Sequence, residues 1–71
     1  MNSFQKMADQ YDQFTFANDG NDYLLFNKDK YYIHQVDEKY VIQSNILSKL
    51  YTVAFDSLED AMIHALQMIE N

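Results

Sequence analysis

The sequence predicts an α+β fold in which an antiparallel sheet of three to five strands lies between an N-terminal and a C-terminal helix. Three observations predict it. Both ends of the chain carry apolar residues at helical spacing. The middle carries short apolar and aromatic segments separated by turn signals. The chain has 71 residues, which is room for one domain over residues 1–71 and one hydrophobic core.

The first helix is expected over residues 3–12. Its apolar residues fall at i, i+3, i+4 and i+7 and form one stripe: Phe4, Met7, Ala8 and Tyr11. Either Asn2 or Ser3 can cap its first free backbone N–H groups.

The middle of the chain predicts an antiparallel meander with short loops. The segments expected as strands are residues 14–17, 23–27, 31–36, 39–44 and 51–55, the first and last of which are left open. The strongest turn signal is Asp19-Gly20, because glycine tolerates the positive φ of a hairpin turn. Lys28-Asp29 and Asp37-Glu38 supply the next turns. Residues 45–50 fit either a helical turn or a loop.

The second helix is the clearest element of the sequence. Its start allows two overlapping capping boxes, Asp56 with Glu59 or Ser57 with Asp60. Its apolar residues then recur at helical spacing: Leu58, Ala61, Met62, Ala65, Leu66 and Ile69.

Strand alternation leaves neither face of the predicted sheet polar. Tyr31 and Ile33 fall on one face, and Tyr32 and His34 on the other. The simplest arrangement packs both helices on one face, whereas the alternative places one helix on each. With both on one face, the second face exposes an apolar and aromatic surface, which predicts a homodimer or a protein partner. The expected interface residues are Tyr23, Phe26, Tyr32, His34 and Tyr40.

Composition limits the function classes. The chain has no arginine and a net charge of −6, which argues against direct nucleic-acid binding. It has no cysteine, so disulfides and thiolate metal sites are excluded. No apolar run is long enough to span a membrane, and the N-terminus lacks a signal-peptide core. We therefore expect a cytoplasmic protein without a membrane contact.

No catalytic motif stands out, and we expect no enzyme activity, cofactor or metal. His64 follows Asp60 by one helical turn and fits a surface ion pair. His34 lies within a strand and fits a packed sheet residue. The segment 18–22 lacks the distal glutamate of a calcium loop and fits a hairpin turn.

The negative charge concentrates at the two ends of the sequence. Residues 1–27 carry a net −3, residues 28–49 a net +1 and residues 50–71 a net −4. If both helices share a face, their acids would form one negative field that attracts a basic partner. The acids expected there are Asp9, Asp12, Glu59, Asp60 and Asp56. The alternative is a solvated acidic surface that only maintains solubility.

In size, acidity and expected α+β build, the chain resembles small acidic inhibitors that phages encode for host takeover. These include DNA mimics aimed at uracil-DNA glycosylase, at restriction enzymes or at the nucleoid protein HU, and the HU inhibitors fit best. The resemblance implies a protein that binds a basic, nucleic-acid-binding host protein, HU-type first, and inhibits it by occupying its DNA-binding surface. The carboxylates that would replace phosphates are Asp9, Asp12, Asp19, Asp22, Asp56, Glu59 and Asp60. The alternative is an interaction or regulatory module that binds through the aromatic sheet face.

Overall fold

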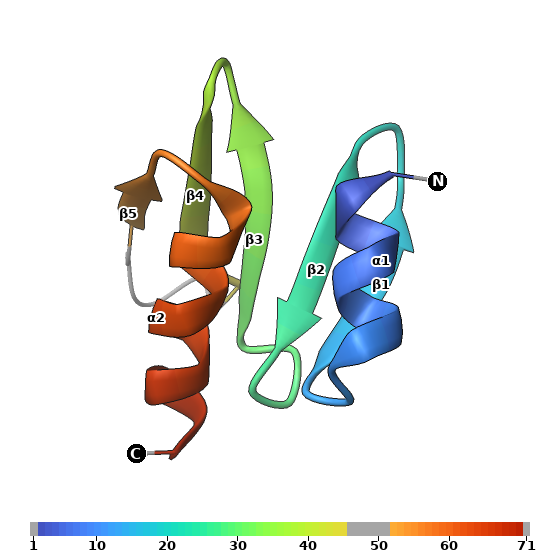
Figure 1. Cartoon of the computed structure of the whole chain (residues 1–71), viewed down its shortest axis with the longest axis vertical. Helices are drawn as coiled ribbons and strands as arrows, with labels where there is room; N and C mark the ends of the chain where they lie inside the picture. Colours follow the sequence, from blue (N-terminus) through green and yellow to red (C-terminus); the bar gives the residue numbers. More distant parts are fainter. Residues whose placement is uncertain (1, 46–51, 71) are drawn as a thin grey trace.

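The computed structural model describes residues 2–45 and 52–70 and has the predicted α+β fold (Figure 1). Its elements are α1 (Ser3–Gln10), β1 (Phe14–Asn18), β2 (Asp22–Phe26), β3 (Tyr31–Val36), β4 (Lys39–Ser44), β5 (Thr52–Phe55) and α2 (Leu58–Glu70). The strands form one antiparallel sheet in the order β1-β2-β3-β4-β5. The two segments left open, near residues 14–17 and 51–55, therefore both supply strands. The choice between a helical turn and a loop at residues 45–50 falls largely on residues 46–51, which lie outside the described residues.

Helix α1 begins at the predicted cap and ends earlier than predicted. The side-chain oxygen of Asn2 accepts a hydrogen bond from the Gln5 N–H at 2.8 Å, which selects Asn2 over Ser3 as the cap. The helix ends at Gln10 rather than residue 12, because Tyr11 takes an extended backbone with φ −132°. The Tyr11 N–H still donates to the Met7 carbonyl at 3.1 Å.

Helix α2 begins with one of the two predicted capping residues. The Ser57 hydroxyl oxygen accepts a hydrogen bond from the Asp60 N–H at 3.1 Å, so Ser57 is the cap. Asp56 instead forms an ion pair with Lys39 on the neighbouring strand β4. Glu59 and Asp60 lie in the first turn, where negative side chains interact favourably with the helix dipole.

Several of the hairpin turns contain residues with a left-handed backbone. Gly20 has φ +88° in the β1–β2 turn, as the Asp-Gly signal predicts. Residues 27–29 all have φ between 55° and 62° in the β2–β3 turn. Asn45 holds that turn, because its side-chain amide donates to the Asp29 carbonyl at 3.2 Å and its backbone N–H donates to the Lys30 carbonyl at 2.7 Å.

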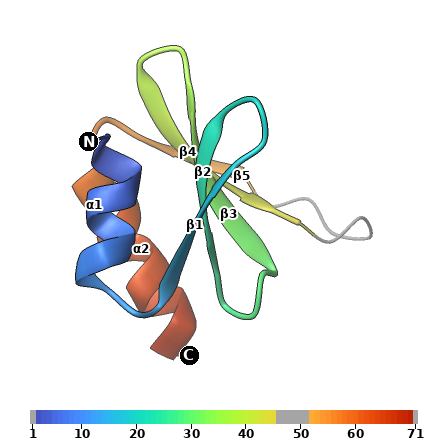
Figure 2. The same ribbon diagram turned by 90° about the vertical axis from the view of Figure 1, so that its right-hand side faces the viewer.

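Both helices pack on the same face of the sheet, as Figure 2 shows. Helix α1 lies against β1 and β2, and α2 lies against β4 and β5. A row of fully buried side chains runs across the middle strands beneath them, with Leu24 opposite Ile33 and Ile33 opposite Ile42. The helices contribute Phe4, Leu58, Ala61, Met62 and Ala65 to this core. The simplest predicted arrangement is therefore confirmed, and no described helix covers the second face.

The meander divides the turns between two ends of the sheet. Because successive strands are antiparallel, the β1–β2, β3–β4 and β5–α2 turns lie at one end, which is the upper end in Figure 1. The α1–β1 and β2–β3 turns lie at the lower end. Both helices run from the upper end to the lower end.

The buried central row gives a test of the core. Ile33 is fully buried, whereas the Ile63 side chain on α2 is 52% exposed. We expect Ile33→Val to lower the free energy of unfolding by about 0.5–1.5 kcal/mol, because it removes one buried methylene. The same change at Ile63 should alter it by less than about 0.5 kcal/mol. Urea denaturation measures both, and equal losses would contradict this placement of the core.

Candidate functional site

The structure divides the seven predicted phosphate-mimicking carboxylates between the two ends of the sheet. Five lie at the upper end, on the β1–β2 hairpin and around the start of α2: Asp19, Asp22, Asp56, Glu59 and Asp60. Asp9 and Asp12 lie at the lower end, in the last turn of α1 and just beyond it. The two helices share a face but run in the same direction, so the acids that end α1 and those that begin α2 do not form one group.

Two acids of the upper end were missed by sequence reasoning. Asp37 and Glu38 form the β3–β4 turn, and both are exposed. A sum of charges along the sequence groups them with the lysines of residues 28–49, a segment with a net charge of +1. Assigning each turn of the meander to one end of the sheet would have grouped them correctly, because alternate turns of a meander share an end.

We define the acidic end as the carboxylates at the upper end of the sheet: Asp19, Asp22, Asp37, Glu38, Asp56, Glu59 and Asp60. All are exposed except Asp22, which is half-buried and accepts a hydrogen bond from the Asn18 amide at 2.6 Å. Asp22 and Asp37 line one hollow of about 290 Å³ beside Phe4. The acidic end therefore presents carboxylates from three separate turns.

Lysines are sparse at the acidic end. Lys39 lies there and pairs with Asp56, and this ammonium group holds the pKa of the Asp56 carboxyl below its usual range, first by its hydrogen bond and then by its charge. Lys6 of α1 and Glu59 line the same groove between α1 and α2, about 420 Å³ in volume. Lys28 and Lys30 lie in the β2–β3 turn at the lower end. In the described ranges, the negative charge is thus sorted toward one end.

The five residues predicted to form an aromatic interface lie on both faces of the sheet. Tyr23, Tyr32 and His34 lie on the face without helices, as predicted. Phe26 pairs with Tyr31 on the helix-covered face and is 1% exposed, so its predicted place in a surface interface is wrong. Tyr40 pairs with Phe55 on that same covered face and packs on the Phe4 ring at 6.0 Å. The physical reason is strand alternation, because these two residues share the parity of the buried row.

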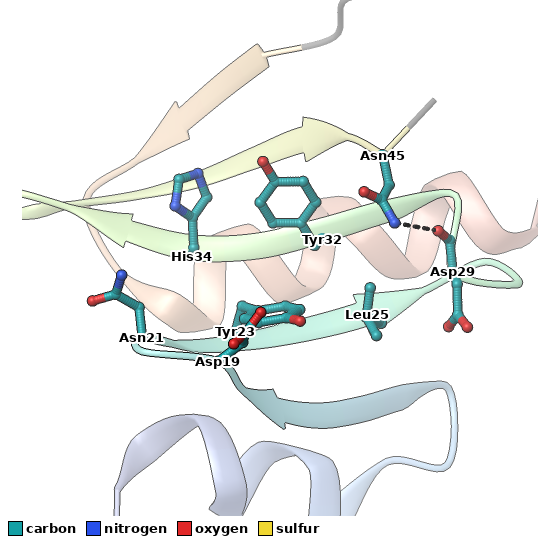
Figure 3. Close-up of a pocket in the computed structure, with 8 residues that line it drawn as sticks. All are labelled: Asp19, Asn21, Tyr23, Leu25, Asp29, Tyr32, His34 and Asn45. Atoms are coloured by element: carbon teal, nitrogen blue, oxygen red, sulfur yellow. Dashed lines mark hydrogen bonds between the residues drawn. The ribbon is translucent and has the colours of Figure 1, made fainter. Parts of the chain in front are cut away.

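The open face is the sheet surface without a described helix, and three rings stand together on it. The Tyr23 and Tyr32 ring centroids are 5.9 Å apart with planes at 71°, and those of Tyr32 and His34 are 5.0 Å apart. The Gln43 side-chain oxygen accepts a hydrogen bond from the Tyr32 hydroxyl at 3.3 Å and also bonds His34 Nε2. These rings help to line a hollow of about 410 Å³ (Figure 3).

Other kinds of site find no support in the described residues. Over residues 2–45 and 52–70, no three histidine, aspartate or glutamate side chains gather in a way that could hold a metal ion. Neither helix in these ranges is long and apolar enough to cross a membrane. The His64 ring lies 5.2 Å from that of Phe55, so it contacts the sheet.

Comparison with protein-family models, with curated proteins and with solved structures finds no match for this chain. Inferences about its function therefore depend on the placement of charges and rings described above.

The Lys39–Asp56 pair gives a test of the acidic end. We expect Lys39→Met to raise the pKa of Asp56 toward its usual range, because the hydrogen bond and the opposite charge are lost together. Carboxyl-carbon NMR titration measures the change, and Lys6→Met is the matched control that should leave the Asp56 titration unaltered.

The same pair predicts a dependence of stability on pH. The pKa of Asp56 is lower in the folded state, so the contribution of the pair is present above the unfolded-state pKa and is lost as the pH falls through the folded-state pKa. The Lys39→Met variant should therefore lose less stability than the wild type on acidification over that range. An Asp56 titration that is identical with and without Lys39 would contradict the pair.

Proposed function

We propose that the protein binds a basic, nucleic-acid-binding protein through the acidic end and occupies the DNA-binding surface of that partner. The observation that supports this proposal is that carboxylates from three turns lie together at one end of the sheet. Lys39 also lies at this end, and its positive charge is paired with Asp56. A field of one sign attracts an oppositely charged partner and guides its approach.

The spacing of the acids suits a partner that reads a nucleic-acid backbone. The β1–β2 and β3–β4 turns are two strands apart across the sheet, or about 10 Å, and the third acidic turn follows β5, the strand next to β4. Each turn carries at least two carboxylates. A series of separated anionic groups along an edge is the feature that a nucleic-acid backbone presents to basic side chains. The acidic end would therefore compete with DNA for the same lysines and arginines of the partner.

The partner class follows the resemblance drawn from the sequence, with an HU-type nucleoid protein as the first candidate. Such a partner works in the bacterial cytoplasm, so the proposal places this protein there, as an inhibitor encoded by a phage. A homodimer, which stays a prediction, would double the charge of −6 that each chain carries.

The carboxylates proposed to contact the partner differ from those predicted from the sequence. Asp37 and Glu38 are included because they extend the acidic end at the centre of the sheet. Asp9 and Asp12 are excluded because they lie at the opposite end. These two pairs carry the same charge and are exposed in the same way, so they form a matched test and control.

We expect the double variant Asp37→Asn/Glu38→Gln to weaken partner binding by about tenfold or more, whereas Asp9→Asn/Asp12→Asn should change it less than about threefold. Immobilised protein captures partners from bacterial lysate at low salt, bound proteins are released with duplex DNA, and mass spectrometry identifies them. A competition assay then measures directly whether this protein displaces a purified HU-type protein from a labelled DNA duplex.

The salt dependence of partner affinity distinguishes this proposal from the alternative, binding through the open face. Binding through the acidic end should weaken by about tenfold or more between about 50 mM and about 200 mM salt, because exposed charges are screened. If affinity hardly changes with salt and both double variants bind like the wild type, the proposal fails. Loss of binding on Tyr32→Leu would then favour the interaction module that uses the open face.

A further inference from the structure

The hollow on the open face has walls of three aromatic rings and lies beside the acidic end. Figure 3 shows the Tyr32 and His34 rings projecting side by side from β3, with the Tyr23 ring lying over β2. Leu25 of β2 continues the floor. The steep angle of 71° between the Tyr23 and Tyr32 rings creates a corner with two aromatic walls. Such a corner offers the electron-rich face of an aromatic ring to one guest.

The walls of the hollow are held in place before any guest arrives. Gln43 of β4 bonds both Tyr32 and His34, so the two rings of β3 are fixed by the next strand. At the rim nearest the lower end of the sheet, the Asn45 side-chain amide donates a hydrogen bond to the Asp29 carbonyl. All three rings stand on paired strands rather than on loops. A guest would therefore need little reorganisation of the site.

The charge around the hollow is negative. Asp19 and Tyr23 lie toward one end of the hollow in Figure 3, and Asp29 lies at the other end with its carboxylate turned outward. Both residues line the hollow, and none of the lysines within residues 2–45 and 52–70 is among its lining residues. Asp19 also belongs to the acidic end, so the hollow opens beside the surface proposed to meet a basic partner.

We propose that this hollow binds an arginine side chain that projects from the basic partner, a statement that rests on the proposed function for the identity of that partner. A guanidinium group stacks on aromatic rings through cation–π attraction and donates hydrogen bonds to a carboxylate such as that of Asp19. Its flat shape suits a corner between two rings. The acidic end supplies attraction over a distance, and the hollow supplies a contact specific to the cation.

The test uses a small probe and needs no partner. N-acetyl-arginine methylamide is titrated into the labelled protein, and amide shifts in residues 19–34 are followed by NMR. The citrulline analogue has nearly the same shape without the charge, and the lysine analogue has the charge without the flat group. We expect the arginine probe to bind about five- to thirtyfold more tightly than the citrulline probe, and more tightly than the lysine probe.

Two variants assign the binding to the hollow. Tyr32→Leu should abolish the shifts, and Asp19→Asn should weaken binding about threefold or more. Asp9→Asn is the matched control, because it removes the same charge at the opposite end of the molecule and should leave the affinity unchanged. Dispersed amide spectra verify that each variant is folded.

Several outcomes would overturn the inference: equal binding of the arginine and citrulline probes, shifts confined to other surfaces, or full binding by Tyr32→Leu. Light scattering that shows a dimer converted to a monomer by Tyr32→Leu would assign the hollow to a second copy of the chain instead. The two proposals fail separately. Probe binding without capture of a basic protein rejects the proposed partner, whereas salt-sensitive capture without probe binding rejects the hollow.

Discussion

The burial of one row of side chains across the central strands determines which residues of this protein can meet other molecules. Leu24 lies opposite Ile33, Ile33 lies opposite Ile42, and all three are fully buried on the face where both helices pack. Because side chains alternate along a strand, this row fixes every other residue of the sheet, and a shift by one residue would exchange the two faces. Tyr32 and His34 are surface residues because Ile33 between them is buried.

The same strand pairing sorts the charges. In a meander, alternate turns share one end of the sheet, so acids that are far apart in sequence become neighbours in space. The turns around Asp19, Asp37 and Asp56 meet in this way, although more than 30 residues separate the first from the last. The distribution of charge along the sequence and its distribution over the surface are therefore different properties.

Local patterns predicted the elements of this chain well, whereas the functional surfaces needed the long-range arrangement. The helix caps, the Asp-Gly turn and the strand alternation all depend on neighbouring residues, and each is visible in the sequence. The direction of α1 relative to α2 is not, and it separates Asp9 from Glu59. The choice of Phe26 and Tyr40 as surface residues ignored an alternation that the sequence already contained. Asp37 and Glu38 join the acidic end only through the strand order of the sheet, because along the chain they lie among lysines.

The core and the two surfaces are physically independent. Among the described residues, the buried set contains no polar or charged side chain, so none of the acids helps to fill the core. Exposed ion pairs contribute little to stability, and neutral replacements at the acidic end remove repulsion between like charges. In the proposed complex, attraction by the acidic end would act over roughly a Debye length, about 8 Å at physiological salt, and would affect mainly the association rate. A ring contact in the hollow would act at touching distance and would affect mainly the dissociation rate. The two surfaces can therefore contribute to one binding event in ways that kinetics separates, without either one being needed for folding.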